Sequence, residues 1–238
     1  MQRPEMPLRV SAVIWDFDDT LVDSLPVRLN ALAQTLRDVD IAGVDAGHFL
    51  LNLTDMTLGE SLAMLAESHG KPTDIYDRYR SIYSTKAPGL VQMFPGVDEV
   101  LGELERRGVP MAVVTQKYRS YEVDGVVAGA AVEMEELGLT GRIPVLIGID
   151  DVTRTKPDPE GVLKALHRLG VPPERALMVG DSVADIRAAK AAGCWSCLAT
   201  WGIPNGEERV RITRPDLVAE APGDLLEILG FSGGSRPA

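Results

Sequence analysis

The sequence is poor in cysteine, in positive charge and in long apolar runs. Two cysteines among 238 residues cannot build a disulfide framework for a chain of this size, so we expect a reducing, cytoplasmic setting. Lysine and arginine total 24 against 35 aspartate and glutamate residues, and the formal charge of −11 argues against nucleic-acid or anionic membrane partners. No apolar run approaches the roughly 18 residues that span a bilayer, and the start of the chain lacks the apolar stretch of a signal peptide.

What the chain does contain is typical of an ordinary globular protein. Hydrophobic residues make up 45% of it and charged residues 25%. The length of 238 residues predicts one large domain, or one domain with an insert. If so acidic a protein handles an anionic substrate, it must concentrate positive charge locally or use a metal ion.

Short, β-branched apolar runs recur along the chain and predict buried strands. They cover residues 8–16, 110–115, 143–148, 176–180 and 194–200, with a weaker run at 217–218. Helical spacing lies between them, at residues 97–107, 159–169, 184–192 and 223–229. Strands that alternate with helices predict an α/β fold with a doubly wound, mostly parallel, Rossmann-like sheet. In such sheets the functional site lies at the carboxyl ends of the strands.

One long stretch breaks this alternation. After the first strand, residues 25–93 contain helical patterns and no good strand. The predicted helices cover residues 26–39, 57–68 and 74–85, with a less regular connector at 40–56. We therefore predict an α/β core domain formed by residues 1–24 and 94–238, which carries the site, and an inserted α-helical cap domain at residues 25–93.

Two of the predicted strands end in pairs of aspartates. Asp16 and Asp18 follow the first strand, and because alternate side chains of an extended chain point the same way, both can face one crevice. Asp181 ends the strand at 176–180, and Asp185 follows one helical turn later. A solvated acidic turn or a helix cap could explain either pair alone, but a parallel sheet would bring the two pairs together. Such oxygen ligands suit a hard cation, and Mg²⁺ needs only one or two carboxylates, a carbonyl and waters.

Two further segments offer the opposite chemistry. Thr115 and Gln116 come at the end of the strand at 110–115 and supply a hydroxyl and main-chain N–H groups. Lys156, in the loop before the helix at 159–169, supplies an ammonium group. A lone threonine or lysine in a loop is usually a surface residue. The order Asp-x-Asp, Thr, Lys and Asp, each at a strand end or in the loop after it, points to one common site.

These segments resemble the four motifs of the haloacid dehalogenase superfamily. The motifs correspond to Asp16-Phe-Asp-Asp-Thr20, Thr115, Lys156-Pro157 and Gly180-Asp-Ser-Val-Ala-Asp185. The run DFDDTLVDSLP and the position of the helical insert are similar to the phosphoglycolate-phosphatase-like branch. The resemblance covers roughly residues 10–230 and implies a phosphatase, that is, a hydrolase of phosphoric monoesters.

The resemblance implies catalytic and phosphate-binding roles for five residues. Asp16 would attack phosphorus and form an aspartyl-phosphate. Asp18 would protonate the leaving oxygen and then accept a proton from the attacking water. Thr115, Gln116 and Lys156 would hold the phosphoryl oxygens as charge spreads over them.

The resemblance also implies a metal site and its supports. Mg²⁺ would bind Asp16, Asp181 and the main-chain carbonyl of Asp18, and would let an anionic carboxylate approach an anionic phosphate. Thr20 and Asp185 would support these ligands from behind, with Asp185 orienting the lysine or a metal-bound water.

The cap would select the substrate, which is expected to be a small phosphorylated metabolite such as phosphoglycolate or a sugar phosphate. We expect cap contacts from Arg28, Asn52 and Thr54. The related phosphosugar mutases use a histidine and an arginine in the cap; our alignment puts Arg28 and Leu58 there, which disfavours a mutase. A phospho-accepting receiver-like signalling module is the other alternative, although it needs neither a cap nor the second aspartate.

The sequence departs from the branch in three places. Asp19 stands where the branch usually has glycine, and Gln116 stands where asparagine is commoner. The segment at 118–140 is longer than usual, and its apolar run at 126–132 predicts a buried helix. These departures bear on the fine geometry of the site and leave the reaction class unchanged.

Overall fold

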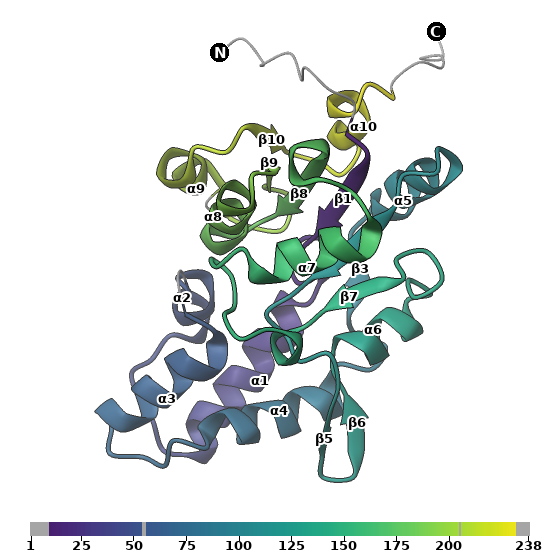
Figure 1. Cartoon of the computed structure of the whole chain (residues 1–238). Coiled ribbons are helices and arrows are strands. Elements are labelled where there is room, and N and C mark those ends of the chain that lie inside the picture. The colour runs from purple at the N-terminus through teal and green to yellow at the C-terminus, as the bar shows by residue number, and fades with distance from the viewer. Residues whose placement is uncertain (1–9, 54–55, 205, 232–238) are drawn as a thin grey trace, which may run out of the picture.

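A six-stranded parallel sheet forms the centre of the computed structural model, which describes residues 10–53, 56–204 and 206–231 (Figure 1). The strand order is β10-β9-β8-β1-β4-β7, and every neighbouring pair is parallel. The strands are β1 (Ala12–Trp15), β4 (Met111–Val114), β7 (Val145–Ile147), β8 (Ala176–Gly180), β9 (Trp195–Ala199) and β10 (Leu217–Ala219). The predicted doubly wound α/β fold is confirmed.

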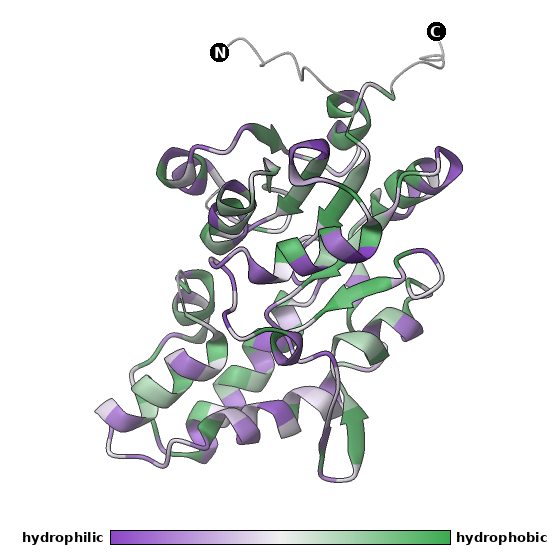
Figure 2. Ribbon diagram, viewed as in Figure 1, coloured by the Kyte–Doolittle hydropathy of each residue, from purple (hydrophilic) through white to green (hydrophobic). Residues whose placement is uncertain are grey.

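Alternation along β1 shows why both faces of this sheet are covered. Val13 and Trp15 pack into one apolar cluster, whereas Ala12 and Ile14 pack into another. The first cluster takes side chains from α5 (Val97–Arg106), α6 (Ala130–Glu136) and α10 (Asp224–Ile228). The second takes side chains from α7 (Glu160–Leu169) and α8 (Val183–Ala192). A strand buried on both faces is largely apolar, as Figure 2 shows for β1 and β7.

Four helices follow the first strand of the sheet along the chain. They are α1 (Leu25–Asp38), α2 (Ala46–Leu51), α3 (Leu58–Ser68) and α4 (Ile75–Lys86). They start and end at a two-stranded antiparallel ribbon of β2 (Val22–Asp23) and β3 (Gln92–Met93). The predicted connector at residues 40–56 is thus partly helical, because Asp45 caps α2 through its side chain.

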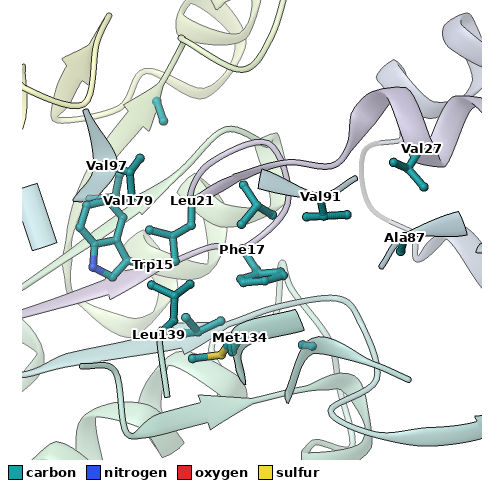
Figure 3. Close-up of a cluster of buried hydrophobic side chains, with 14 of the residues drawn as sticks. Trp15, Phe17, Leu21, Val27, Ala87, Val91, Val97, Met134, Leu139 and Val179 are labelled. Carbon is teal, nitrogen blue, oxygen red and sulfur yellow. The ribbon is translucent and has the colours of Figure 1, made fainter. Parts of the chain in front are cut away.

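The apolar core continues from the sheet into these helices (Figure 3). Trp15 and Phe17 lie fully buried at the end of β1. Beyond Phe17 the cluster reaches Val27 at the start of α1 and Ala87 at the end of α4. The four helices are therefore joined to the sheet by packing at the same place where β1 delivers its polar residues.

The apolar run at 126–132 is a buried helix only in its last part, where α6 begins at Ala130. It contains β6 (Val126–Ala128), which pairs with β5 (Tyr121–Val123) in an antiparallel hairpin. Asp124 and Gly125 between them have φ of 51° and 77°, the left-handed conformation that a tight hairpin turn requires. The hairpin extends from the sheet and lies against α4, where Ser81 donates a hydrogen bond to Asp124 (Figure 1).

Three short helical elements complete the described chain. They are η1 (Ile149–Asp151), η2 (Pro173–Arg175) and α9 (Gly206–Thr213), and α9 packs on α8. In the part of the chain that the structure describes, no helix combines the length and apolarity needed to cross a bilayer.

Candidate active site

Three neighbouring strands deliver polar side chains to one edge of the sheet. Asp16 follows β1, Thr115 follows β4 and Asp181 follows β8, and β1 lies between the other two strands. Main-chain hydrogen bonds fix two of these positions, from Asp16 N to Val179 O at 2.8 Å and from Thr115 N to Ile147 O at 3.0 Å. All three side chains are buried at the edge where the sequence predicts them to meet.

Lys156 lies at the centre of this edge. Its Nζ is 2.6 Å from Asp16 Oδ1, 2.6 Å from Asp185 Oδ1 and 2.9 Å from the carbonyl oxygen of Val114. These contacts use all three donors of the ammonium group. Burial alone would lower the pKa of Lys156, but the charges of Asp16 and Asp185 outweigh it and raise that pKa, so the lysine is charged.

Three buried carboxylates form a cluster around this lysine. One oxygen from each of Asp16, Asp181 and Asp185 lies within 4.8 Å of the others. Asp185 is held by hydrogen bonds from the main chain and hydroxyl of Ser182, and a Cβ on Gly180 would lie only 2.4 Å from its carboxyl carbon. The glycine and serine of this motif therefore make room for the aspartate and orient it.

The cluster carries more negative charge than its protein partners compensate. Burial and the neighbouring charge of Asp185 raise the pKa of Asp16 to about 7, against the opposing effect of Lys156. Burial, together with Asp19 and Asp16, also raises the pKa of Asp181. An all-oxygen site with unbalanced negative charge fits a hard divalent cation such as Mg²⁺. This cluster differs from the expected set of metal ligands in one member. It contains the side chain of Asp185, whereas the third expected ligand is the main-chain carbonyl of Asp18.

The side chain of Asp18 points to a different set of partners. It accepts a hydrogen bond from Ser24 and pairs with Lys117 at 2.9 Å. Lys117 Nζ also lies 2.7 Å from Glu133 and 2.8 Å from the hydroxyl of Tyr83. Burial alone would raise the pKa of Asp18, but Lys117, Arg28 and Ser24 lower it below its usual value. Asp16 and Asp18 lie two residues apart on the chain, but the pKa of Asp16 is raised and that of Asp18 is lowered.

Two of the three phosphate-binding residues predicted from the sequence contact each other. Gln116 Nε2 donates to the carbonyl oxygen of Lys156 at 2.9 Å and so joins the two loops. The hydroxyl of Thr115 accepts from the main-chain N–H of Lys117 at 3.1 Å. Thr20, predicted to support the metal ligands, has its Oγ1 3.4 Å from Asp181 Oδ1.

The expected cap contacts have different outcomes. Arg28 pairs with Asp19 at 3.2 Å. It also lines the crevice bounded by Asp16, Thr115, Lys156 and Asp181, called the crevice below. Asn52 is exposed, its amide donates to His48 O at 2.7 Å, and it is not among the residues that line the crevice. Thr54 lies outside the described residues. Leu51, next to Asn52, lines the crevice instead.

The backbone of Asp19 adopts a conformation that is unusual for a residue other than glycine. Its φ of 59° is left-handed, the conformation that glycine adopts without strain, and the related branch usually has glycine here. Burial raises the pKa of Asp19, Arg28 opposes this effect, and its Oδ1 is buried without a hydrogen-bond partner. The unusual residue thus keeps the turn and adds another acidic group beside the cluster.

Arg209 and Lys117 belong to the site although the sequence predicts neither. Arg209, in α9, donates to Asp181 Oδ2 at 3.0 Å, to the Asp181 carbonyl at 2.7 Å and to the Leu51 carbonyl at 3.0 Å. It thereby connects the acidic cluster to the helices of the insert. A charged run such as the one around Arg209 is indistinguishable from a solvated helix face, so no signal in the sequence separates it.

Comparisons with known proteins agree with this geometry. A family model for haloacid dehalogenase-like hydrolases matches residues 13–199. Phosphoglycolate phosphatases from Shigella boydii and Escherichia coli are 32% identical over 247 aligned positions, which cover 93% of this chain and 93% of each relative.

Solved structures show the same fold. A haloacid dehalogenase-like family hydrolase from Streptococcus pneumoniae has a TM-score of 0.72 at 22% identity and covers 92% of this chain and 98% of its own. A hydrolase from Pseudomonas syringae has a TM-score of 0.73 at 23% identity, with coverages of 92% and 97%. With the family model spanning most of the sheet and its motifs, the chain belongs to the haloacid dehalogenase-like hydrolases and is an enzyme of the phosphatase kind.

Proposed function

We propose that the protein is a Mg²⁺-dependent phosphatase that hydrolyses a small phosphomonoester, phosphoglycolate-like or a sugar phosphate, through an aspartyl-phosphate on Asp16. One observation carries the proposal. A single buried edge holds a carboxylate paired with Lys156 at 2.6 Å, and two residues later a second carboxylate with its own partners. In the proposed mechanism the first carboxylate attacks phosphorus and the second moves a proton.

In the first step a carboxylate oxygen of Asp16 forms a bond to phosphorus as the bond from phosphorus to the ester oxygen breaks. Thr115, Gln116 and Lys156 line the crevice and would hold the phosphoryl oxygens. Asp18 protonates the departing oxygen. In the second step Asp18 accepts a proton from water, whose oxygen attacks the phosphorus of the aspartyl-phosphate and frees Asp16.

Asp18 must gain a proton before it can act as an acid. In the free site Lys117, Arg28 and Ser24 lower its pKa, so it is ionised. An incoming phosphate dianion raises the pKa of a nearby carboxylate and competes for the same cations. The proposal therefore couples protonation of Asp18 to substrate binding.

Mg²⁺ would be held by Asp16, Asp181 and the main-chain carbonyl of Asp18, with Asp185 beside them. When bound, it supplies the positive charge that lets an anionic carboxylate approach an anionic phosphate.

We further propose that residues 25–93 act as the cap and that Arg28 is its substrate contact. Because Cys194 and Cys197 are both free and buried, a reducing cytoplasm suits the protein.

A panel of phosphomonoesters assayed with and without Mg²⁺ tests the proposed function. We expect phosphate release that requires Mg²⁺ and that falls to background in the Asp16→Asn variant. Full turnover by that variant would overturn the mechanism. An Asp151→Asn variant is the matched control, because Asp151 is an acidic residue of η1 that does not line the crevice.

A further inference from the structure

A second cavity of about 120 Å³ adjoins the catalytic crevice on the far side of Asp18. The two share Asp18, Arg28, Leu50, Leu53 and Gln116 as lining residues, so a substrate with its phosphate in the crevice can place its leaving group in the cavity. The sequence contains five tyrosines, and all five line this cavity. They are Tyr76, Tyr79, Tyr83, Tyr118 and Tyr121.

Two separate elements bring these tyrosines together. Tyr76, Tyr79 and Tyr83 lie on one face of α4, with successive ring centroids 6.0 and 5.9 Å apart. Tyr118 and Tyr121 come from the hairpin segment that is longer than usual for the family, and their rings meet edge to face at 6.1 Å. The extra length of this segment therefore supplies part of the wall of a cavity beside the site.

Arg80 holds the two groups of rings in place. Its guanidinium carbon lies 5.4 Å from the ring centroid of Tyr76 on α4, and 5.0 and 4.8 Å from those of Tyr118 and Tyr121. Such cation–π contacts fix ring orientation across the boundary between helix and hairpin. The aromatic rings that line the cavity are thus held in fixed orientations before a ligand binds.

The cations that line the cavity already have acidic partners. Lys117 is shared by Asp18 and Glu133, Arg28 pairs with Asp19, and Arg80 pairs with Asp77. Arg28 and Arg80 each keep a buried Nε without a hydrogen-bond partner, but a glycolate carboxylate in the cavity would lie beside the carboxylates of Asp18 and Glu133, which would repel it. Apart from Gln116 and Gly129, the rest of the lining is tyrosine or leucine, which favours an uncharged group with an apolar body. An engineered cavity of about 150 Å³ binds benzene, so about one ring is the size that this space accepts.

We propose that the preferred substrate is a phosphomonoester of an uncharged alcohol that bears an aromatic ring, with the ring in the tyrosine-lined cavity. This inference rests on the proposed phosphatase activity and replaces the phosphoglycolate-like or sugar phosphate substrate with an aromatic one. The ester oxygen leaves phosphorus with the bonding electron pair, takes the proton of Asp18, and departs as the ring-bearing alcohol. In the second step water hydrolyses the aspartyl-phosphate. The products of the whole reaction are that alcohol and inorganic phosphate.

Three esters test the substrate class: benzyl phosphate, cyclohexylmethyl phosphate and 2-phosphoglycolate. The first two have similar size and leaving-group chemistry and differ in the aromatic ring. Ring–ring contacts add about 0.5–1.5 kcal/mol beyond burial, so we expect kcat/KM for benzyl phosphate to exceed that for cyclohexylmethyl phosphate about 2- to 10-fold. We expect it to exceed that for 2-phosphoglycolate at least about 10-fold. Equal values for the two ring esters, or a preference for 2-phosphoglycolate, overturn the inference.

A variant of Tyr118, which lies just before the hairpin, tests whether the cavity produces this preference. Tyr118→Leu is expected to raise KM for benzyl phosphate about 10-fold while kcat stays within about 2-fold, because the ring touches the leaving group and not the phosphorus. Val127→Ser, at an exposed position on the same hairpin, is the matched control and should leave both constants unchanged. An unchanged KM in a folded Tyr118→Leu protein contradicts the assignment.

Calorimetric binding to the Asp16→Asn protein, with every tyrosine intact, provides a readout that needs no turnover. We expect tighter binding of benzyl phosphate than of 2-phosphoglycolate, and the reverse order overturns the inference. Failure of the proposed function is a different result: the wild-type protein would release phosphate from none of the esters, whatever their order of binding.

Discussion

The ammonium group of Lys156 lies 2.6 Å from the carboxylate of Asp16, and both side chains are buried at the carboxyl edge of the sheet. The same ammonium reaches Asp185 at an equal distance. A buried ion pair of this kind costs desolvation, which its mutual attraction offsets only while both partners remain. The stability of the site and its proposed chemistry therefore depend on the same lysine.

Replacing Lys156 with methionine should destabilise the protein by about 3–5 kcal/mol, because Asp16 and Asp185 would lose their shared cation. Urea unfolding measures this change. Lys164→Met is the control, since Lys164 is an exposed partner of Glu160 and should change stability by about 0.5 kcal/mol or less. Adding Asp16→Asn to Lys156→Met should cost less than the sum of the single changes; strict additivity would show that the two residues do not interact.

Mg²⁺ should stabilise the fold in a pH-dependent way. The pKa of Asp16 is about 7 in the folded protein against 3.8 ordinarily, so its contribution to stability is present below pH 3.8 and is lost as pH rises through 7. Ionised carboxylates then remain for a cation to compensate. Mg²⁺ at 100 times its Kd adds about 2.7 kcal/mol, which corresponds to a Tm increase of roughly 5–10 °C.

Thermal unfolding at pH 5 and pH 8, with and without Mg²⁺, measures this effect. We expect the larger shift at pH 8, because more of the Asp16 population is ionised there. Asp181→Asn should abolish most of the shift, since Asp181 is a member of the acidic cluster. A shift of the same size in that variant, or a larger one at pH 5, would contradict the proposed metal site.

Most of this site can be located from the sequence because three of the motif residues directly follow strands. Asp16, Thr115 and Asp181 must converge once the sheet is parallel, whatever the details of packing. The hairpin is different: residues 126–132 are apolar enough to predict a buried helix, and the tight turn at Asp124 and Gly125 decides the structure instead. Val126 and Val127 are consequently exposed on a strand.

Partners that come from distant parts of the chain escape sequence reasoning. Arg209 lies 28 residues after the aspartate that it contacts, in a charged helix that looks like any solvated helix face. Lys117 follows the predicted phosphate-binding pair, but its bonds to Asp18 and Glu133 depend on how α6 packs. Such contacts have no fixed spacing, so only the folded chain reveals them.

Asp18 should matter most for esters whose leaving group needs a proton. Asp18→Asn is expected to lower kcat for an alkyl phosphate about 100-fold or more, the usual contribution of a general acid. For 4-nitrophenyl phosphate, whose leaving group is stable as an anion, the first step needs no acid and the loss should be much smaller. Steady-state assays on both esters decide the matter, and equal losses would assign Asp18 a role other than proton transfer to the leaving group.

The left-handed conformation at Asp19 predicts an order of stability between two variants. Asp19→Gly and Asp19→Ala both lose the pair with Arg28, so their difference isolates the effect of the backbone φ of 59°. The glycine variant should be more stable than the alanine variant by about 1 kcal/mol, because a Cβ disfavours this conformation. Chemical denaturation gives both values, and an alanine variant at least as stable as the glycine variant would show that the turn is not held there.

The most direct measurement of the central claim is a rapid acid quench of the enzyme during turnover of a phosphomonoester, followed by mass spectrometry of its peptides. We predict a phosphoryl group on the peptide that contains Asp16, absent from the Asp16→Asn protein and lost within about one turnover when substrate runs out. A phosphoryl group that persists for minutes would indicate a receiver-like signalling role. Full phosphate release with an unmodified Asp16 peptide would contradict the aspartyl-phosphate mechanism.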